Sequence, residues 1–161
     1  MTPIAFYHTA GETPASLDAV LPALLEKALK GGNRVLLIAP TPARQQRLDE
    51  ALWSYAESAF LPHGKPDDAP PAAQPVLLVT AEDDFTRYLT DKDTPRIPVL
   101  LAGAESALPS LTAAPIARIL YLFTASTADV ERGRSLFKQL KTAGHAMSYH
   151  QQTPSGWEKK A

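Results

Sequence analysis

Short apolar runs alternate along the chain with segments in which apolar residues recur every three to four positions. Runs that are apolar at nearly every position are typical of central strands in a parallel sheet, which are buried on both faces, and helical spacing indicates a face packed against that sheet. The expected strands are 3–9, 34–40, 76–81, 99–104 and 118–125, with an alternating edge strand at 145–151. This order predicts an α/β fold, a three-layer α/β/α sandwich with a mostly parallel, Rossmann-like sheet.

The helices have recognisable ends. A proline is well tolerated at a first helical position because its missing N–H would have no partner there, and Ser or Thr caps a helix start through its side-chain oxygen. The expected helix starts are Pro14, Pro42, and Ser126 or Thr127. Pro22 falls inside the first helix, yet the apolar spacing around it still favours a helix.

The 161 residues are most simply a single domain over 1–151. Residues 64–75 are a proline-rich connector, too polar to pack well. The segment 82–98 is ambiguous and is interpreted as one short helix with a surface loop, and 152–161 are interpreted as a C-terminal tail.

Composition excludes several classes of function. The chain has no cysteine, which rules out disulfides, thiolate metal sites and a cysteine nucleophile. Its formal net charge of −1 gives no overall attraction to nucleic acid, so any basic surface must be local. We see no signal peptide and no apolar run of the ~20 residues that span a bilayer. A cytoplasmic protein without membrane contact is therefore expected.

The motifs of catalysis are largely missing. The turn after 34–39, PTPARQQ, has neither the glycines nor the Lys-Ser/Thr pair of a phosphate-binding loop. The acidic run Glu82, Asp83 and Asp84 follows a strand, but a solvated loop explains it more simply. His145 and His150 would point to opposite faces of one strand and cannot share a metal. We expect no catalytic residues, no cofactor and no metal.

Two surfaces exceed what folding requires, and the first is aromatic. Trp53 follows the apolar face of its helix by one position, and Tyr55, Phe60 and Pro62 continue the patch into an irregular segment. Either this segment folds back onto its own core, or another protein covers it. Tryptophan and tyrosine are favoured anchors of protein interfaces, which favours a partner-binding site.

The second surface lies on the last helix. Arg134, Phe137, Lys138 and Lys141 follow helical spacing and align along one face. The helix dipole alone explains why acids precede bases in this helix, but it does not explain three bases around an aromatic ring. A basic rim beside an apolar slot suits an acidic peptide that ends in a large apolar residue.

At this point a family resemblance is visible. The segments LDEALWSYAESAFLPHG (48–64), AGHAMSYHQQTPSGWEKKA (143–161) and FYHT (6–9) resemble the chi subunits of bacterial DNA polymerase III. The order of strands and helices also fits, so the resemblance covers nearly the whole chain. Residues 64–98 match least.

The resemblance implies a non-catalytic accessory subunit of the clamp-loader complex. Chi subunits link that complex to single-stranded-DNA-binding protein by holding its acidic C-terminal tail, which ends in phenylalanine. By position, Arg134, Phe137, Lys138 and Lys141 match the residues that bind this tail. DNA would then be contacted only indirectly.

The aromatic patch of Trp53, Tyr55, Phe60 and Pro62 resembles the surface that faces the loader. Its partner there is the small psi subunit or another clamp-loader subunit, and the sequence leaves both open. A second hypothesis also stays open, namely a small α/β enzyme or nucleotide-binding domain with a site at the C-terminal ends of the strands.

Overall fold

The computed structural model describes residues 2–55, 63–66, 74–89 and 95–161, except for the side chain of Tyr55. Its α-helices are α1 (Pro14–Lys30), α2 (Pro42–Tyr55), α3 (Leu108–Ala113) and α4 (Thr127–Thr142). Short 3₁₀ turns occupy Thr86–Tyr88 and Glu105–Ala107. The strands are β1 (Ile4–His8), β2 (Arg34–Ala39), β3 (His63–Gly64), β4 (Val76–Thr80), β5 (Arg96–Leu101), β6 (Ile119–Phe123), β7 (Met147–Thr153) and β8 (Gly156–Lys159).

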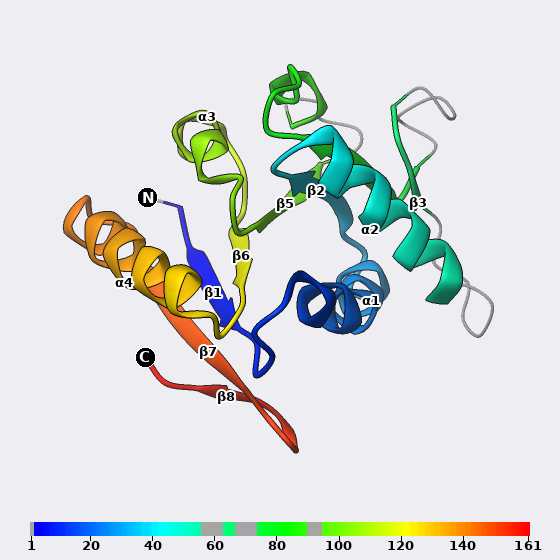
Figure 1. Cartoon of the computed structure of the whole chain (residues 1–161). Coiled ribbons are helices and arrows are strands. Elements are labelled where there is room, and N and C mark those ends of the chain that lie inside the picture. Colours follow the sequence, from blue (N-terminus) through cyan, green and yellow to red (C-terminus); the bar gives the residue numbers. More distant parts are fainter. Residues whose placement is uncertain (1, 56–62, 67–73, 90–94) are drawn as a thin grey trace.

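The described strands form one sheet in the order β3-β4-β2-β5-β6-β1-β7-β8 (Figure 1). Every neighbouring pair is parallel except β7 and β8, which are antiparallel. Parallel strands need long crossover connections, and α1, α2, α3 and α4 each lie in one of them. The predicted α/β/α sandwich on a mostly parallel sheet is therefore confirmed.

Helices cover both faces of the sheet, and each face has its own apolar core. On one face, α1 and α2 contribute Leu21, Leu25, Leu48 and Leu52, which are at most 1% exposed. On the other face, α3 and α4 pack over β1 and β6, where Phe6 is fully buried. Burying one such side chain contributes about 1.5–3 kcal/mol relative to leaving it in water. The central strands are apolar at nearly every position because both of their faces meet helices.

The predicted helix starts are confirmed. Pro14 and Pro42 are the first residues of α1 and α2. Ser126 is the N-cap of α4, and its side chain accepts a hydrogen bond from the backbone N–H of Asp129 at 3.2 Å. Pro22 is buried inside α1, which continues through it, so apolar packing outweighs the hydrogen bond that proline cannot donate.

The interpretation of residues 152–161 as a tail was wrong. Strand β7 extends to Thr153, and β8 returns antiparallel to it, with Gln152 opposite Trp157 and Thr153 opposite Gly156. Gly156 has φ of 130°, a conformation that residues with a side chain rarely adopt. The Pro-Ser-Gly cluster thus forms the turn of a hairpin, and β7, expected at the edge, is bonded on both sides.

Two further segments differ from expectation. Within 82–98 the described residues form the 3₁₀ turn Thr86–Tyr88, and β5 begins at Arg96 instead of 99. Arg96 is buried, and its guanidinium donates hydrogen bonds to the carbonyls of Gln74 (2.7 Å) and Val35 (3.0 Å). These hydrogen bonds offset the cost of removing the charge from water. The short edge strand β3 was not predicted, and residues 67–73 of the proline-rich connector lie outside the described residues.

Candidate functional site

Helix α4 presents the predicted basic residues to solvent. Arg134, Lys138 and Lys141 are all exposed, and their spacing of four and then three places them on one side of the helix. We call these three residues the basic face. The structure therefore brings together the charged members of the predicted tail-binding set.

Phe137, the fourth member of the set, is more buried than the three basic residues. Its half-buried ring packs edge-on against Phe6 of β1 (centroids 5.4 Å apart) and against Tyr149 of β7 (5.9 Å). The ring therefore belongs to the contact between α4 and the sheet, and only its remaining exposed edge can meet a partner. Tyr149, which is also half-buried, extends this aromatic surface onto β7.

Arg134 reaches the end of β1. The hydroxyl of Tyr149 and Nδ1 of His8 are 2.7 Å apart, and the Arg134 guanidinium acts on both groups. Burial, followed by the positive charge of Arg134, lowers the pKa of His8, which favours the neutral imidazole. Burial raises the pKa of Tyr149, against a smaller opposing effect of Arg134. Arg134 is thus the cation whose charge acts on both groups at this end of the basic face.

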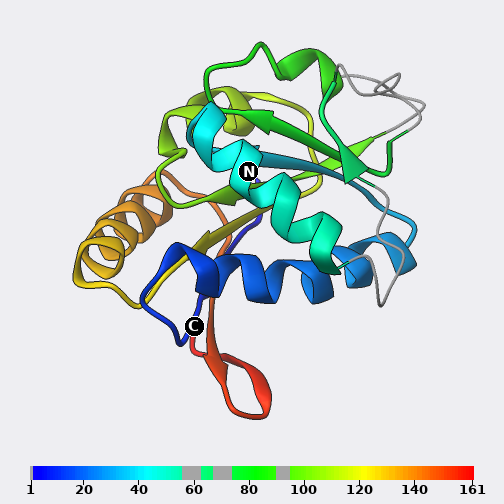
Figure 2. The ribbon, with the colours of Figure 1, turned by 45° about the vertical axis from the view of Figure 1, so that its right-hand side comes forward.

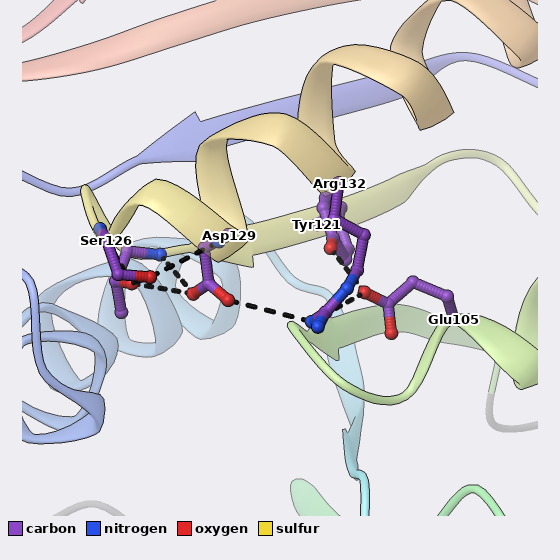
Figure 3. A network of polar contacts seen from close by, with 6 residues as sticks. Glu105, Tyr121, Ser126, Asp129 and Arg132 are labelled. Atoms are coloured by element: carbon purple, nitrogen blue, oxygen red, sulfur yellow. Dashed lines mark hydrogen bonds and ion pairs between the residues drawn. The ribbon is translucent and has the colours of Figure 1, made fainter.

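Helix α4 is held on the sheet by a polar network at its start (Figure 3). The carboxylate of Asp129 accepts hydrogen bonds from the hydroxyl of Thr124 (2.6 Å) and from its backbone N–H (3.0 Å). Arg132 lies between Asp129 and Glu105, with N–O distances of 3.6 and 3.5 Å. The Tyr121 hydroxyl donates to Glu105 at 2.9 Å, and burial, then Glu105, raises the pKa of Tyr121. The network fixes the helix that carries the basic face.

Close packing adds to this anchoring. Gly133 is the buried residue of α4, and a Cβ atom at this position would lie 3.1 Å from the ring of Phe123. The missing side chain therefore lets α4 approach β6 closely.

Four acidic groups near the C-terminal ends of the strands, Asp83, Asp84, Glu105 and Asp129, are engaged in structural contacts. Asp83 accepts a hydrogen bond from the backbone N–H of Thr80 at 2.9 Å, and Asp84 accepts one from the Thr86 hydroxyl at 3.2 Å. Glu105 and Asp129 belong to the network above. Over the described ranges, no three His, Asp or Glu side chains are grouped as metal ligands would be. The arrangement at this edge serves to tie turns and α4 to the sheet.

The aromatic patch can be described only at Trp53. This side chain is 57% exposed, and it is the one exposed large hydrophobic residue in the described part of the chain. Its ring lies against His63 of β3 (4.6 Å between centroids), and Nε2 of buried His63 is 3.4 Å from Oδ1 of Asp49. The side chain of Tyr55, and Phe60 and Pro62, lie outside the described residues.

Sequence reasoning missed two groups of residues. Tyr149 and His8 join the basic face because β7 pairs in parallel with β1, with Phe6 opposite Tyr149 and His8 opposite Gln151. Tyr7, His150 and Trp157 gather on the opposite face of the sheet. Alternation along residues 6–8 and 148–151 was a usable signal, because successive side chains of a strand point to opposite faces of the sheet. The register between β1 and β7 was still needed to show which residues of the two strands lie together.

As to membranes, each described helix is too short or too polar to span a bilayer.

The fold is that of a Rossmann-like α/β/α sandwich. The chain belongs to the DNA polymerase III chi subunit (HolC) family, whose model matches residues 1–148. Among curated relatives, a probable DNA polymerase III subunit chi from Rickettsia prowazekii is 32% identical over 78 residues, 48% of this chain and 46% of the relative. DNA polymerase III subunit chi from Pseudomonas aeruginosa is 34% identical over 82 residues, 51% of this chain and 56% of the relative. The matched segment thus spans about half the length of these relatives.

Proposed function

We propose that this protein is a non-catalytic chi subunit of the DNA polymerase III clamp-loader complex. In this role it links the complex to single-stranded-DNA-binding protein by binding that protein's acidic C-terminal tail. The observation that carries the proposal is the basic face of α4, in which Arg134, Lys138 and Lys141 are exposed beside the half-buried ring of Phe137. Family membership supports the same assignment.

Charge complementarity supports an acidic peptide as the ligand. Acidic side chains would meet Lys138 and Lys141, while the guanidinium of Arg134 suits a free carboxylate because it can donate two parallel hydrogen bonds. Each exposed ion pair contributes only about 0–1 kcal/mol. The charges therefore orient the peptide and speed its arrival more than they determine its affinity.

The apolar part of the affinity would come from the last residue of the tail. Phe137 and Tyr149 offer half-buried rings beside the basic face. A terminal phenylalanine can pack on them edge-to-face, which is worth about 0.5–1.5 kcal/mol beyond the area it buries.

The anchoring of α4 supports a preformed site. The Asp129–Arg132–Glu105 contacts and the close approach at Gly133 fix the helix on the sheet before any ligand arrives. A site on a rigid element loses less entropy on binding than a site on a loop.

The second half of the proposal concerns the loader side. Trp53, whose side chain is 57% exposed, would be part of a surface that binds psi or another clamp-loader subunit. It is the member of this surface whose side chain the structure describes. Large aromatic side chains are enriched among residues whose truncation most weakens an interface.

Isothermal titration with the tail peptide tests the proposal. The peptide should bind the wild-type protein, and binding should be lost in Lys138→Glu and Arg134→Glu. Lys30→Glu is a matched control, because Lys30 is an exposed lysine in the last turn of α1, and it should bind normally. A peptide whose last phenylalanine is replaced by alanine should also fail to bind. Equal binding by Lys138→Glu, Arg134→Glu and Lys30→Glu would contradict the assignment of α4.

A further inference from the structure

A groove lies on the face of the sheet opposite α4. Helix α1 covers this face only up to about β6, and β1, β7 and β8 extend past it (Figures 1 and 2). Between α1 and these strands lies a cavity of about 560 Å³, with Tyr7, His150 and Trp157 on the strand side and Lys27 on the helix side. This volume is in the range of ordinary ligand sites.

Three rings form the floor of this groove. Tyr7 and His150 are partners in the parallel ladder between β1 and β7, and their rings stack at 4.8 Å with an angle of 11° between planes. Trp157 of β8 packs edge-on against Tyr7 at 5.1 Å. All three side chains are only half-buried. We call these three residues the ring cluster.

The charges around the ring cluster are basic. Lys27 and Arg118 line the groove and are exposed, as is Lys159 of β8. Burial, then the charges of Lys159 and Lys27, lowers the pKa of His150, which shows that both cations act at this ring. Among the described residues that line the groove, none is acidic.

The C-terminal end of α1, which also borders the groove, should repel an anion only weakly. A helix C-terminus carries partial negative charge on its free carbonyls. Here the carbonyls of Lys27, Ala28 and Leu29 accept hydrogen bonds from the backbone N–H groups of residues 31–33. The basic side chains therefore set the sign of the local potential.

The groove continues along the strands. A second hollow of about 290 Å³ shares Tyr7, Arg118 and His150 with the first and reaches Pro3 and Ser148. Two hollows that share one stacked ring pair suit an extended ligand better than a compact one.

We propose that this groove binds single-stranded DNA directly, with bases stacked on the ring cluster and phosphates near Lys27, Arg118 and Lys159. Aromatic side chains interleaved with cations are the usual means of gripping a single strand without reading its sequence. The proposal goes beyond the tail-binding function and beyond the sequence analysis, which expected only indirect contact with DNA. Trp157 and His150 also lie outside residues 1–148, which match the family.

An acidic peptide fits this groove less well. Extended peptides are commonly recognised through the free backbone groups of an edge strand. The groove floor is instead a sheet face: β1 and β7 are hydrogen-bonded on both sides, and of the three strands of the floor β8 alone, at the end of the sheet, has a free edge. Ring faces and cations remain as contacts, and these suit bases and phosphates.

Fluorescence anisotropy of a labelled oligo(dT) strand tests the proposal. At low salt the wild-type protein should bind the strand, more tightly than a duplex of equal length. Trp157→Ala should weaken binding roughly 5- to 150-fold, the loss expected for one stacked base, while Trp53→Ala, at the distant exposed tryptophan, should not. Trp157→Phe, which keeps a ring, should retain most of the affinity.

Salt dependence provides a readout that a folding defect would not imitate. For single strands the logarithm of affinity falls with the logarithm of salt by about 0.7 for each phosphate contact. Lys27→Glu should reduce the steepness of this salt dependence by at least about 0.7, the value for one phosphate contact. Lys30→Glu, about one turn further along α1 and outside the groove lining, should leave the salt dependence unchanged.

Three results would overturn the proposal. One is the absence of strand binding by the wild-type protein at low salt. Another is equal binding by the wild type, Trp157→Ala and Lys27→Glu. The third is loss of strand binding in Lys138→Glu, which would place the strand on α4. Tail-peptide titrations of the same variants keep the two proposals separate, because groove variants should bind the tail normally.

Discussion

The hydroxyl of Tyr149 lies 2.7 Å from Nδ1 of His8, so a hydrogen bond connects the side chains of β7 and β1 beside α4. The imidazole also stacks on Phe123 of β6 at 4.9 Å. His8 is thus held between a hydroxyl, an aromatic ring and the positive charge of Arg134. These surroundings favour its neutral form, and we therefore expect the fold to lose stability in mild acid.

The first prediction is a loss of stability just below pH 6.5. In the folded protein the pKa of His8 is lowered from the usual 6.5, first by burial and second by the charge of Arg134. The pKa of His150 is lowered in the same way, first by burial and then by the charges of Lys159 and Lys27. As the pH falls through 6.5, the unfolded chain takes up protons before the folded one, so the free energy of unfolding decreases. Urea unfolding between pH 7.5 and 5.5 should show this decrease, and His8→Gln should make it shallower.

A histidine titration followed by NMR separates the two causes. In Arg134→Gln the midpoint of His8 should rise but stay below 6.5, because burial is the larger cause. A midpoint of His8 at or above 6.5 in the wild-type protein would contradict the prediction.

The second prediction concerns the approach of α4 to the sheet. In Gly133→Val the new side chain would meet the ring of Phe123, which is 1% exposed and packed between His8 and Tyr121. Overpacking of this kind costs about 1–3 kcal/mol. Urea unfolding should show such a loss, and tail binding should weaken because α4 moves. Ser135→Val, at an exposed position of the same helix, should change both much less.

Much of the fold followed from the sequence because the strongest signals were local. Apolar runs such as 34–39 and 76–80 are buried on both faces, and proline at Pro14 and Pro42 marked helix starts correctly. The hairpin of β7 and β8 was missed because Pro154, Ser155 and Gly156 signal both a turn and an irregular chain end. Only pairing with a distant strand distinguishes the two.

The candidate site was predictable only in part for a similar reason. Helical spacing correctly grouped Arg134, Lys138 and Lys141, since residues three and four apart share a face. It also placed Phe137 among them, although the ring turns toward Phe6 and Tyr149. How deep a side chain sits at the boundary of a helix face depends on the sheet beneath it. Tyr149 and His8 could be added only through the β1–β7 register.

The third prediction concerns Trp53. At 57% exposure the indole contributes little to the core, so Trp53→Ala should change the free energy of unfolding by less than about 1 kcal/mol. Binding of psi or of another clamp-loader subunit should instead weaken by about 2 kcal/mol or more, the usual loss at a dominant anchor. Titration with each purified subunit and urea unfolding measure the two effects. If Trp53→Ala unfolded at lower urea while partner binding stayed intact, the ring would instead be stabilising β3 by packing on His63.

The last prediction concerns the salt dependence of tail binding. The basic face is exposed, so its attraction for an acidic tail should weaken as salt screens it over about 10 Å at 0.1 M. Burial of the terminal phenyl ring against Phe137 and Tyr149 is not screened. The affinity should therefore fall with salt and then level off at a value set by the ring contact.

Titrations across a salt series in the wild type, Lys141→Gln and Phe137→Ala test this division. Lys141→Gln should make the decline shallower with the same final level, because it removes one charge and no ring. Phe137→Ala should keep the slope and lower the final level; since it also removes a contact with Phe6, its fold must be checked by urea unfolding. Tail binding that does not change with salt would mean that Arg134, Lys138 and Lys141 form only a solvated helix face.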